Sequence, residues 1–319
     1  MTDRLAVRKT YKLFIAGLFV RSESGRYDRN QGFNVPRGSR KDVRDAVKAA
    51  RSASGPWAAR TAYNRGQILY RCAEALESRA ADFVSSAGHV SVSLGGEPGA
   101  SLGGEPGASR GGEPGASLGG EPGASRSELE PGASRSELDA SIDVLVHYAG
   151  WTDKLQPVLG GINPVAAPFL SFSLPEPTGV VGIVAPDSPP LLGLIAELAP
   201  VMAAGNTAVC ILSNEHPLPG LDLAEVLGIA DVPGGVVNLL SGRRGELAPV
   251  LAGHHALNAI VNASGDPSLG AEIDKLASES VTRVRHSEPT TGYEEAVQDA
   301  LARLEAVTEL KTAWHPVGA

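Results

Sequence analysis

Cysteine and aromatic residues are scarce in this sequence. Two cysteines, Cys72 and Cys210, are too few for a disulfide framework or a cysteine-ligated metal site. Aromatic residues make up 5% of the 319 residues, which argues against a base-stacking surface for nucleic acid. The net charge of −8 argues against nucleic acid and anionic membranes as well. We therefore expect no metal site and no nucleic-acid partner.

Long apolar runs are also missing. No stretch approaches the ~20 residues that a membrane-spanning helix needs, and residues 1–11 are too polar for a signal peptide. We therefore expect no membrane partner and a place in the cytoplasm. A composition of 42% hydrophobic and 20% charged residues is ordinary for a globular protein, and the length suits one large or two medium domains.

The most informative stretch is residues 176–213, EPTGVVGIVAPDSPPLLGLIAELAPVMAAGNTAVCILS. Residues 179–185 and 207–212 are continuous apolar runs, and residues 191–204 between them have helical periodicity. Buried strands on both sides of a helix are typical of a parallel sheet whose two faces are covered. The stretch therefore predicts a βαβ unit, which forms the cofactor-binding half of many nucleotide enzymes.

Several motifs taken together resemble the aldehyde dehydrogenase superfamily. They are GVVGIVAP, LAPVMAAGNTAV and DVPGGVVNLLSG, with YAGWTDK and an N-terminal hairpin over residues 11–25. The resemblance implies an α/β fold: a Rossmann-like parallel sheet with flanking helices plus a small β oligomerisation arm. VTELKTAW at residues 307–314 resembles the family's C-terminal strand, which would join residues 169–174 in that arm.

The chain is expected to have four parts. A hairpin and helices of the cofactor domain occupy residues 1–92, and a Gly/Pro/Glu insertion occupies residues 93–133. The Rossmann-like domain with its arm strand covers residues 134–282, and a linker, a helix and the C-terminal strand cover residues 283–319. The insertion repeats SLGGEPGA-like units every eight residues. Because it has almost nothing to bury, we expect a flexible, solvated low-complexity loop.

Local signals predict where helices begin and end. Ser39 and Asp42 are spaced for an acidic variant of the capping box, and Pro56 is expected to end the helix that they begin. The other expected elements are a helix over residues 64–84, a loop over residues 283–291 and a helix over residues 294–306.

The resemblance implies oxidation of an aldehyde through a cysteine thiolate, with hydride transfer to NAD or NADP and hydrolysis of a thioester. The family's cysteine and glutamate motifs have no counterpart, since the residues after Ala277 read SESVTRVRHSEPTTG. We expect the whole catalytic domain to be missing and assign no catalytic residue. Cys210 lies on a predicted buried strand, which favours a core position over a substitute nucleophile.

The cofactor contacts implied by the resemblance are altered. Ile211 stands where the family has a lysine that reaches the adenosine ribose, and Asn214 stands at a glutamate position. Asp187 adds a negative charge that an oxyanion would avoid. A helix N-terminus beside Ser264 could still attract a phosphate. The candidate cofactor-binding residues are Pro186, Ser188, Ser213, Gly242, Arg243, Ser264 and Gly265, with binding of NAD or NADP expected to be weakened or lost.

Four interpretations of function stay open at this point. The first is a catalytically inactive subunit, a pseudoenzyme, that pairs through its arm with itself or with a full-length aldehyde dehydrogenase. The second is a residual NAD(P)-binding module. The third is an NAD(P)-dependent aldehyde oxidoreductase that uses Cys210 as a non-standard nucleophile. The fourth is a gene product without a role.

Overall fold

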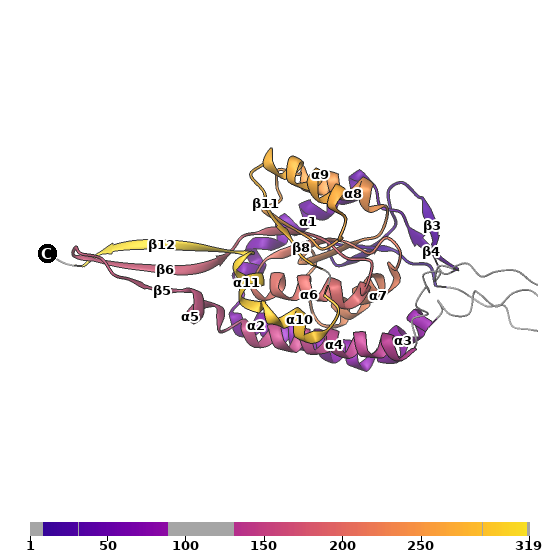
Figure 1. Cartoon of the computed structure of the whole chain (residues 1–319), viewed down its shortest axis with the longest axis horizontal. Helices are drawn as coiled ribbons and strands as arrows, with labels where there is room; N and C mark the ends of the chain where they lie inside the picture. The colour runs from indigo at the N-terminus through magenta and orange to yellow at the C-terminus, as the bar shows by residue number, and fades with distance from the viewer. Residues whose placement is uncertain (1–8, 31, 89–130, 289, 318–319) are drawn as a thin grey trace, which may run out of the picture.

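The computed structural model describes residues 9–30, 32–88, 131–288 and 290–317 (Figure 1). Most of the expected insertion over residues 93–133 lies outside the described residues, so its flexibility stays a prediction. Its last three residues belong to helix α4 (Pro131–Trp151), which corrects the expected boundary. No helix within the described part of the chain is long and apolar enough to cross a bilayer.

A seven-stranded sheet forms the centre of the molecule, in the order β11-β10-β7-β8-β9-β1-β2. Its first five strands are parallel, whereas β1 and β2 form an antiparallel hairpin at one edge. The parallel strands of the centre are buried on both faces, as their apolar runs predict. The expected Rossmann-like sheet is thereby confirmed. The strands are β1 (Leu13–Ile15), β2 (Leu18–Val20), β7 (Val180–Val184), β8 (Thr207–Ile211), β9 (Val237–Leu240), β10 (Ala259–Asn262) and β11 (Arg283–His286).

Helices cover both faces of the sheet (Figure 1). One apolar cluster joins the sheet to α1, α8 and α9, and a larger one joins the opposite face to α6, α7 and the outer helices. Helix α6 is buried over almost its whole length, because α4 packs on the side that faces away from the sheet. The helices are α1 (Arg40–Ala58), α2 (Ala62–Ser78), α3 (Ala80–Gly88), α5 (Leu155–Leu159), α6 (Pro190–Ala203), α7 (Leu218–Ile229), α8 (Arg244–Ala252), α9 (Pro267–Ser278), α10 (Tyr293–Gln298) and α11 (Ala300–Glu305).

A three-stranded antiparallel sheet projects from this body (Figure 1). It contains β5 (Gly161–Asn163), β6 (Phe169–Pro177) and β12 (Thr308–Pro316), with β6 in the middle. Strands β6 and β12 pair along nine residues. The expected pairing of residues 169–174 with residues 307–314 is therefore confirmed, and we call this three-stranded sheet the arm. A separate hairpin joins β3 (Tyr27–Asn30) to β4 (Phe33–Pro36).

The first helix ends later than the sequence predicts. The capping box of Ser39 and Asp42 is present. The expectation that Pro56 ends the helix is wrong, because α1 continues to Ala58. A proline in the last turn removes a single backbone donor, and the carbonyl groups that follow it have no helical partner in any case.

Two long expected helices are each divided in two. The segment over residues 64–84 breaks at Arg79, where φ is −107° and ψ is 15°. The segment over residues 294–306 breaks at Asp299, where φ is −108° and ψ is 32°. Apolar periodicity continues across both breaks and therefore hides them from sequence analysis.

The expected loop over residues 283–291 begins instead with strand β11, which pairs in parallel with β10. Its sequence RVRH carries three basic or titratable side chains, which is unusual for a buried strand. An edge strand tolerates such side chains because they can reach solvent or a partner. The sequence alone did not show the acidic partner of Arg285, which lies 88 residues earlier at Glu197.

Candidate functional site

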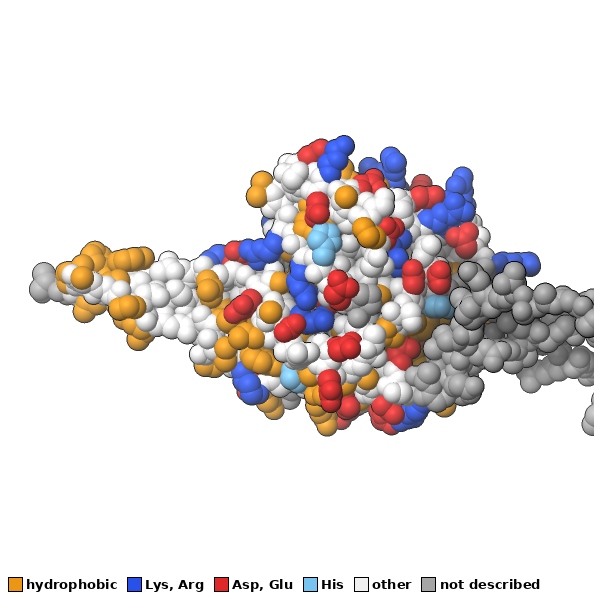
Figure 2. Space-filling view, viewed as in Figure 1, with side chains coloured by type: hydrophobic (Ala, Val, Ile, Leu, Met, Phe, Trp, Pro, Cys, Tyr) orange, Lys and Arg blue, Asp and Glu red, His pale blue; other side chains and the backbone are white. Residues whose placement is uncertain are grey.

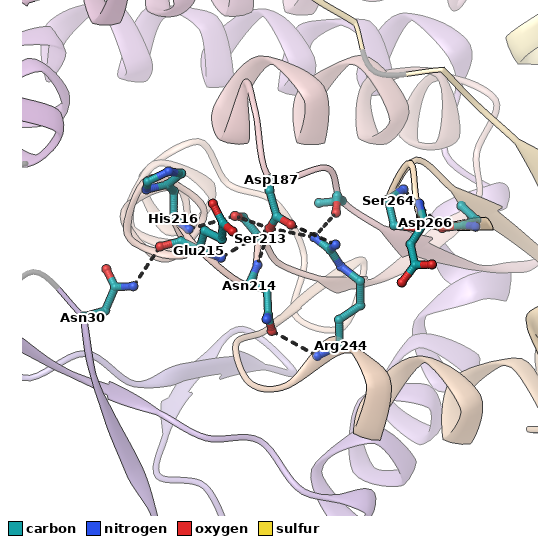
Figure 3. Close-up of polar contacts among 11 residues, drawn as sticks. Asn30, Asp187, Ser213, Asn214, Glu215, His216, Arg244, Ser264 and Asp266 are labelled. Atoms are coloured by element: carbon teal, nitrogen blue, oxygen red, sulfur yellow. Dashed lines mark hydrogen bonds and ion pairs between the residues drawn. The ribbon is translucent and has the colours of Figure 1, made fainter. Parts of the chain in front are cut away.

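The order in which successive strands are added to the sheet reverses at β7. Strands β7, β8 and β9 follow one another across the sheet, and the chain then returns to place β10 on the other side of β7. In open α/β sheets, ligands bind outside the carboxyl ends of the strands at such a switch point. The loops after β7, β8, β9 and β10 carry all the predicted cofactor-binding residues. The structure therefore brings these residues to one edge of the sheet, where Figure 3 shows Ser213 and Ser264.

An ion pair between Asp187 and Arg244 occupies this edge (Figure 3). The guanidinium group donates to both carboxylate oxygens, over 2.8 Å to Oδ1 and 3.1 Å to Oδ2. It also donates to the backbone oxygen of Ala185 over 2.8 Å. The Arg244 side chain is 9% exposed and the Asp187 side chain 32% exposed. The Arg244 charge is therefore committed to a partner within the protein.

Further hydrogen bonds tie the β8 loop to the same carboxylate. The Ser213 hydroxyl donates to Asp187 Oδ1 over 2.9 Å, and the Asn214 backbone N–H donates to it over 2.7 Å. Burial alone would raise the pKa of Asp187, but the Arg244 charge and these hydrogen bonds outweigh burial and hold the pKa below its ordinary value. Asp187, Ser213, Asn214 and Arg244 form what we call the Asp187–Arg244 cluster, which fixes three loops together.

The N-termini of α6, α8 and α9 are each satisfied by a side-chain oxygen of the protein. Glu137 on α4 accepts from the N–H groups of Leu191 and Leu192 at the start of α6, over 2.7 and 3.1 Å. Asn214 accepts from the first N–H of α8 over 3.2 Å. Asp266 caps α9 and accepts from two of its N–H groups. Two of these three helix ends thus carry a carboxylate at the position where an anion would bind.

The remaining predicted residues lie around the cluster without joining it. Pro186 is buried, and its ring packs so closely on α6 that a Cβ at Gly193 would lie 2.2 Å from Pro186 Cγ. Ser188 is exposed. Arg243 is exposed at the start of α8, and Gly242 has a φ of 144°, which a side chain would strain. No hydrogen bond among the described residues links Ser264 or the exposed Gly265 to the cluster.

Both cysteines lie in the core. Cys210 is fully buried in β8, and burial raises the pKa of its thiol. Burial likewise raises the pKa of Cys72 to about 12. Both shifts oppose the thiolate form that a nucleophile requires. The core position expected for Cys210 is confirmed by its burial.

Sequence analysis missed Glu137 and Asp266. Asp266 comes directly before Pro267, and an acidic cap followed by proline is a helix-start signal that could have been recognised. Glu137 lies 54 residues from the N–H group that it accepts from, and no local pattern indicates such a contact. Asp187 was considered by itself, and its pairing with Arg244 emerges only from the sheet topology.

The class of protein that this fold and sheet edge define is an α/β protein with a Rossmann-like sheet and a projecting β arm. The family model of the aldehyde dehydrogenase family matches residues 24–89 and 129–287, which is more than half of the chain. The chain therefore belongs to the aldehyde dehydrogenase family.

The individual relatives share less than a third of their residues with this chain, and they are longer than it is. Human retinaldehyde dehydrogenase 3 is 27% identical over 285 residues, which cover 86% of this chain and 47% of the relative. The mitochondrial aldehyde dehydrogenase of Rattus norvegicus is 28% identical over 255 residues, which cover 79% of this chain and 39% of the relative. An NAD+ complex of an aldehyde dehydrogenase from Bacillus cereus superposes with a TM-score of 0.70 at 25% identity, covering 87% of this chain and 50% of that one. The chain spans about half the length of the relatives that it matches.

Replacing Asp187 with alanine is expected to lower the free energy of unfolding by about 2 kcal/mol, because Arg244 would stay buried without its partner. The partial exposure of Asp187 keeps the loss below that of a fully buried pair. Since its pKa is lowered in the folded protein, the contribution is present above the ordinary pKa of 3.8 and lost as the pH falls through the folded value. Urea unfolding across this range measures both effects, and a pH-independent difference between wild type and variant would contradict the assignment.

Proposed function

We propose that this chain is a catalytically inactive member of its family, a pseudoenzyme that acts as an assembly subunit. It would pair through the arm with itself or with a full-length aldehyde dehydrogenase. The observation that carries the proposal is the set of helix ends at the switch point, each of which is satisfied by Glu137, Asn214 or Asp266. The protein keeps its fold and its arm, but its own side chains occupy the helix ends where a ligand would bind. Such a protein is suited to a structural or regulatory role.

The residues at this edge fit a dinucleotide poorly. A pyrophosphate would meet the Asp266 carboxylate at the start of α9, and Arg244 is already bound to Asp187. Ile211 is fully buried in β8 and offers no polar atom to a ribose. Among the predicted residues, Arg243 is the cation that remains exposed, and a single exposed arginine gives a weak phosphate site.

The arm supports the assembly role. Strand β12 adds nine residues to β6, yet most side chains of β12 are exposed. Figure 2 shows hydrophobic side chains gathered on the arm, away from the body. Large exposed apolar side chains on a projecting sheet are typical of a surface that a partner covers. The cytoplasm is the compartment that we expect for this assembly.

A residual nucleotide-binding module is the second candidate. Its support is the switch-point position of Ser264 and Gly265, together with the likeness to the Bacillus cereus structure, which is an NAD+ complex. An aldehyde oxidoreductase that uses Cys210 has less support, since burial holds that thiol protonated and out of reach of a substrate.

Calorimetric titration of NAD and NADP, with light scattering on the same sample, tests the proposal. We expect no binding heat, together with a mass above the 32.9 kDa of one chain or a mixed species after coexpression with a full-length aldehyde dehydrogenase. Tight binding would move the conclusion to the nucleotide-binding module. A protein that stays monomeric alone and with the full-length enzyme would overturn the assembly role.

A further inference from the structure

A groove of about 850 Å³ lies at the edge of the seven-stranded sheet that the β1–β2 hairpin forms. Strands β8 and β9 separate this hairpin from β7 at the switch point. The walls of the groove are the hairpin β1–β2, whose outer strand β2 is largely exposed, on one side and the flank of α1 on the other. Sites of roughly 300–1,000 Å³ are typical of ligand pockets. The apolar lining includes Leu18, Val20, Ala49, Ala53 and Pro56.

The strand that borders the groove has a free backbone edge. Ile15 and Leu18 flank the two-residue turn of the hairpin and form a hydrogen-bonded pair, so Phe14 and Phe19 form the next, non-hydrogen-bonded pair. Phe14 directs its backbone groups to β9, with which it pairs. The N–H and C=O of Phe19 therefore point outward, where no strand of the described chain follows β2. An added strand can pair there.

The rim of the groove carries unpaired positive charge. Arg21, Lys48 and Arg60 are exposed, and no carboxylate in the described part of the chain lies within ion-pair distance of them. The neighbouring Lys41 is paired with Asp45 over 3.7 Å. The remaining acids are Asp42, which is held in the capping box, and Glu23. The rim therefore favours a partner that brings carboxylates.

From these three features we propose that the groove binds an extended acidic peptide segment of a partner protein. The segment adds a strand to β2 through the backbone of Phe19, and alternate apolar side chains enter the space beside α1. Its carboxylates meet Arg21, Lys48 and Arg60. This site is separate from the arm and does not depend on the assembly role.

The test uses the full chain and a fluorescein-labelled octapeptide, VTVTLTEE, in an anisotropy titration. We expect saturable binding that weakens at least about tenfold in the double variant Lys48→Glu with Arg60→Glu. The double variant Arg40→Glu with Arg44→Glu is the matched control, because it reverses two charges that are exposed on α1, the helix of Lys48, but do not line the groove. It should bind as wild type does. The peptide VTVTLTKK should not bind.

Phe19→Pro gives the sharper comparison. It removes the outward N–H while leaving the bonds between β1 and β2, and Phe19→Ala removes the same ring but keeps the N–H. We expect Phe19→Pro to abolish binding and Phe19→Ala to retain it, with both variants showing the wild-type circular dichroism spectrum. Equal binding by the two variants, or no saturable binding to wild type, would overturn the proposal. So would competition by the chain's own SLGGEPGA peptide, or concentration-dependent dimerisation lost in Phe19→Pro.

Discussion

Replacing Glu197 with leucine is expected to lower the free energy of unfolding by about 3–5 kcal/mol. Glu197 lies on α6 and is 2% exposed. Its carboxylate accepts from Arg285 over 2.8 Å and also pairs with Arg303, which is itself 6% exposed. Leucine would fill similar space but would leave the Arg303 charge buried without a counter-ion.

The position of Glu197 explains why the effect should be global. The carboxylate joins α6 in the body to β11 through Arg285 and Ser287, and to α11 through Arg303. Helix α11 leads directly into β12 of the arm. Loss of this contact therefore weakens the attachment of the C-terminal segment that completes the arm. Urea unfolding followed by circular dichroism measures the change in the free energy of unfolding.

Two further variants separate charge from packing. The double variant Glu197→Leu with Arg303→Leu removes both charges and should recover part of the stability lost by Glu197→Leu. Arg71→Ala breaks an ion pair with Asp231 in which the Arg71 side chain is 47% exposed and the Asp231 side chain 72% exposed. It should lower the free energy of unfolding by less than ~1 kcal/mol. Equal losses for Glu197→Leu and Arg71→Ala would contradict a buried electrostatic role.

The sequence predicted the parts of the fold that depend on local apolar pattern. Strands β7 and β8 and helix α6 lie within one or two residues of their expected bounds, because each buries a continuous or periodic apolar face. The pairing of β6 with β12 is a contact between residues far apart in the chain, and it was predicted through the family resemblance. Strand β11 was missed because its basic side chains hide the strand pattern.

The site was harder to predict than the fold. The candidate residues lie in loops after the strands, and the sequence could not show which partners those loops meet. Arg244 and Asp187 are 57 residues apart, and Glu137 reaches the start of α6 from a different helix. These polar contacts decide whether a helix end is free for an anion. These contacts depend on how distant segments pack together, so the identity of the replaced residues alone does not reveal them.

Both faces of the arm carry exposed apolar side chains, but the hydrogen bonds among its hydroxyl and amide side chains lie on one face. On that face, Asn163 donates to the hydroxyls of Ser171 and Ser173, and Ser173 bonds to Thr312 over 2.8 Å. Phe169, Leu310 and Trp314 share that face with the polar side chains. Ile162, Leu170, Phe172 and Leu174 lie on the opposite face, to which β12 contributes Lys311, Ala313 and His315. Burial under a partner would stabilise the apolar face that β5 and β6 form there.

Charging that apolar face is therefore expected to abolish assembly without unfolding the chain. Leu170 and Leu174 are 40% and 37% exposed, so the double variant Leu170→Glu with Leu174→Glu adds two charges where a partner would pack, yet leaves the body intact. Light scattering should give the mass of a single chain. Thermal unfolding should give the melting temperature of the wild type. Ser173→Ala with Thr312→Ala alters the other face of the same strands and should leave assembly unchanged. If the charged variant assembles as wild type does, the face that carries Leu170 and Leu174 is not the contact surface.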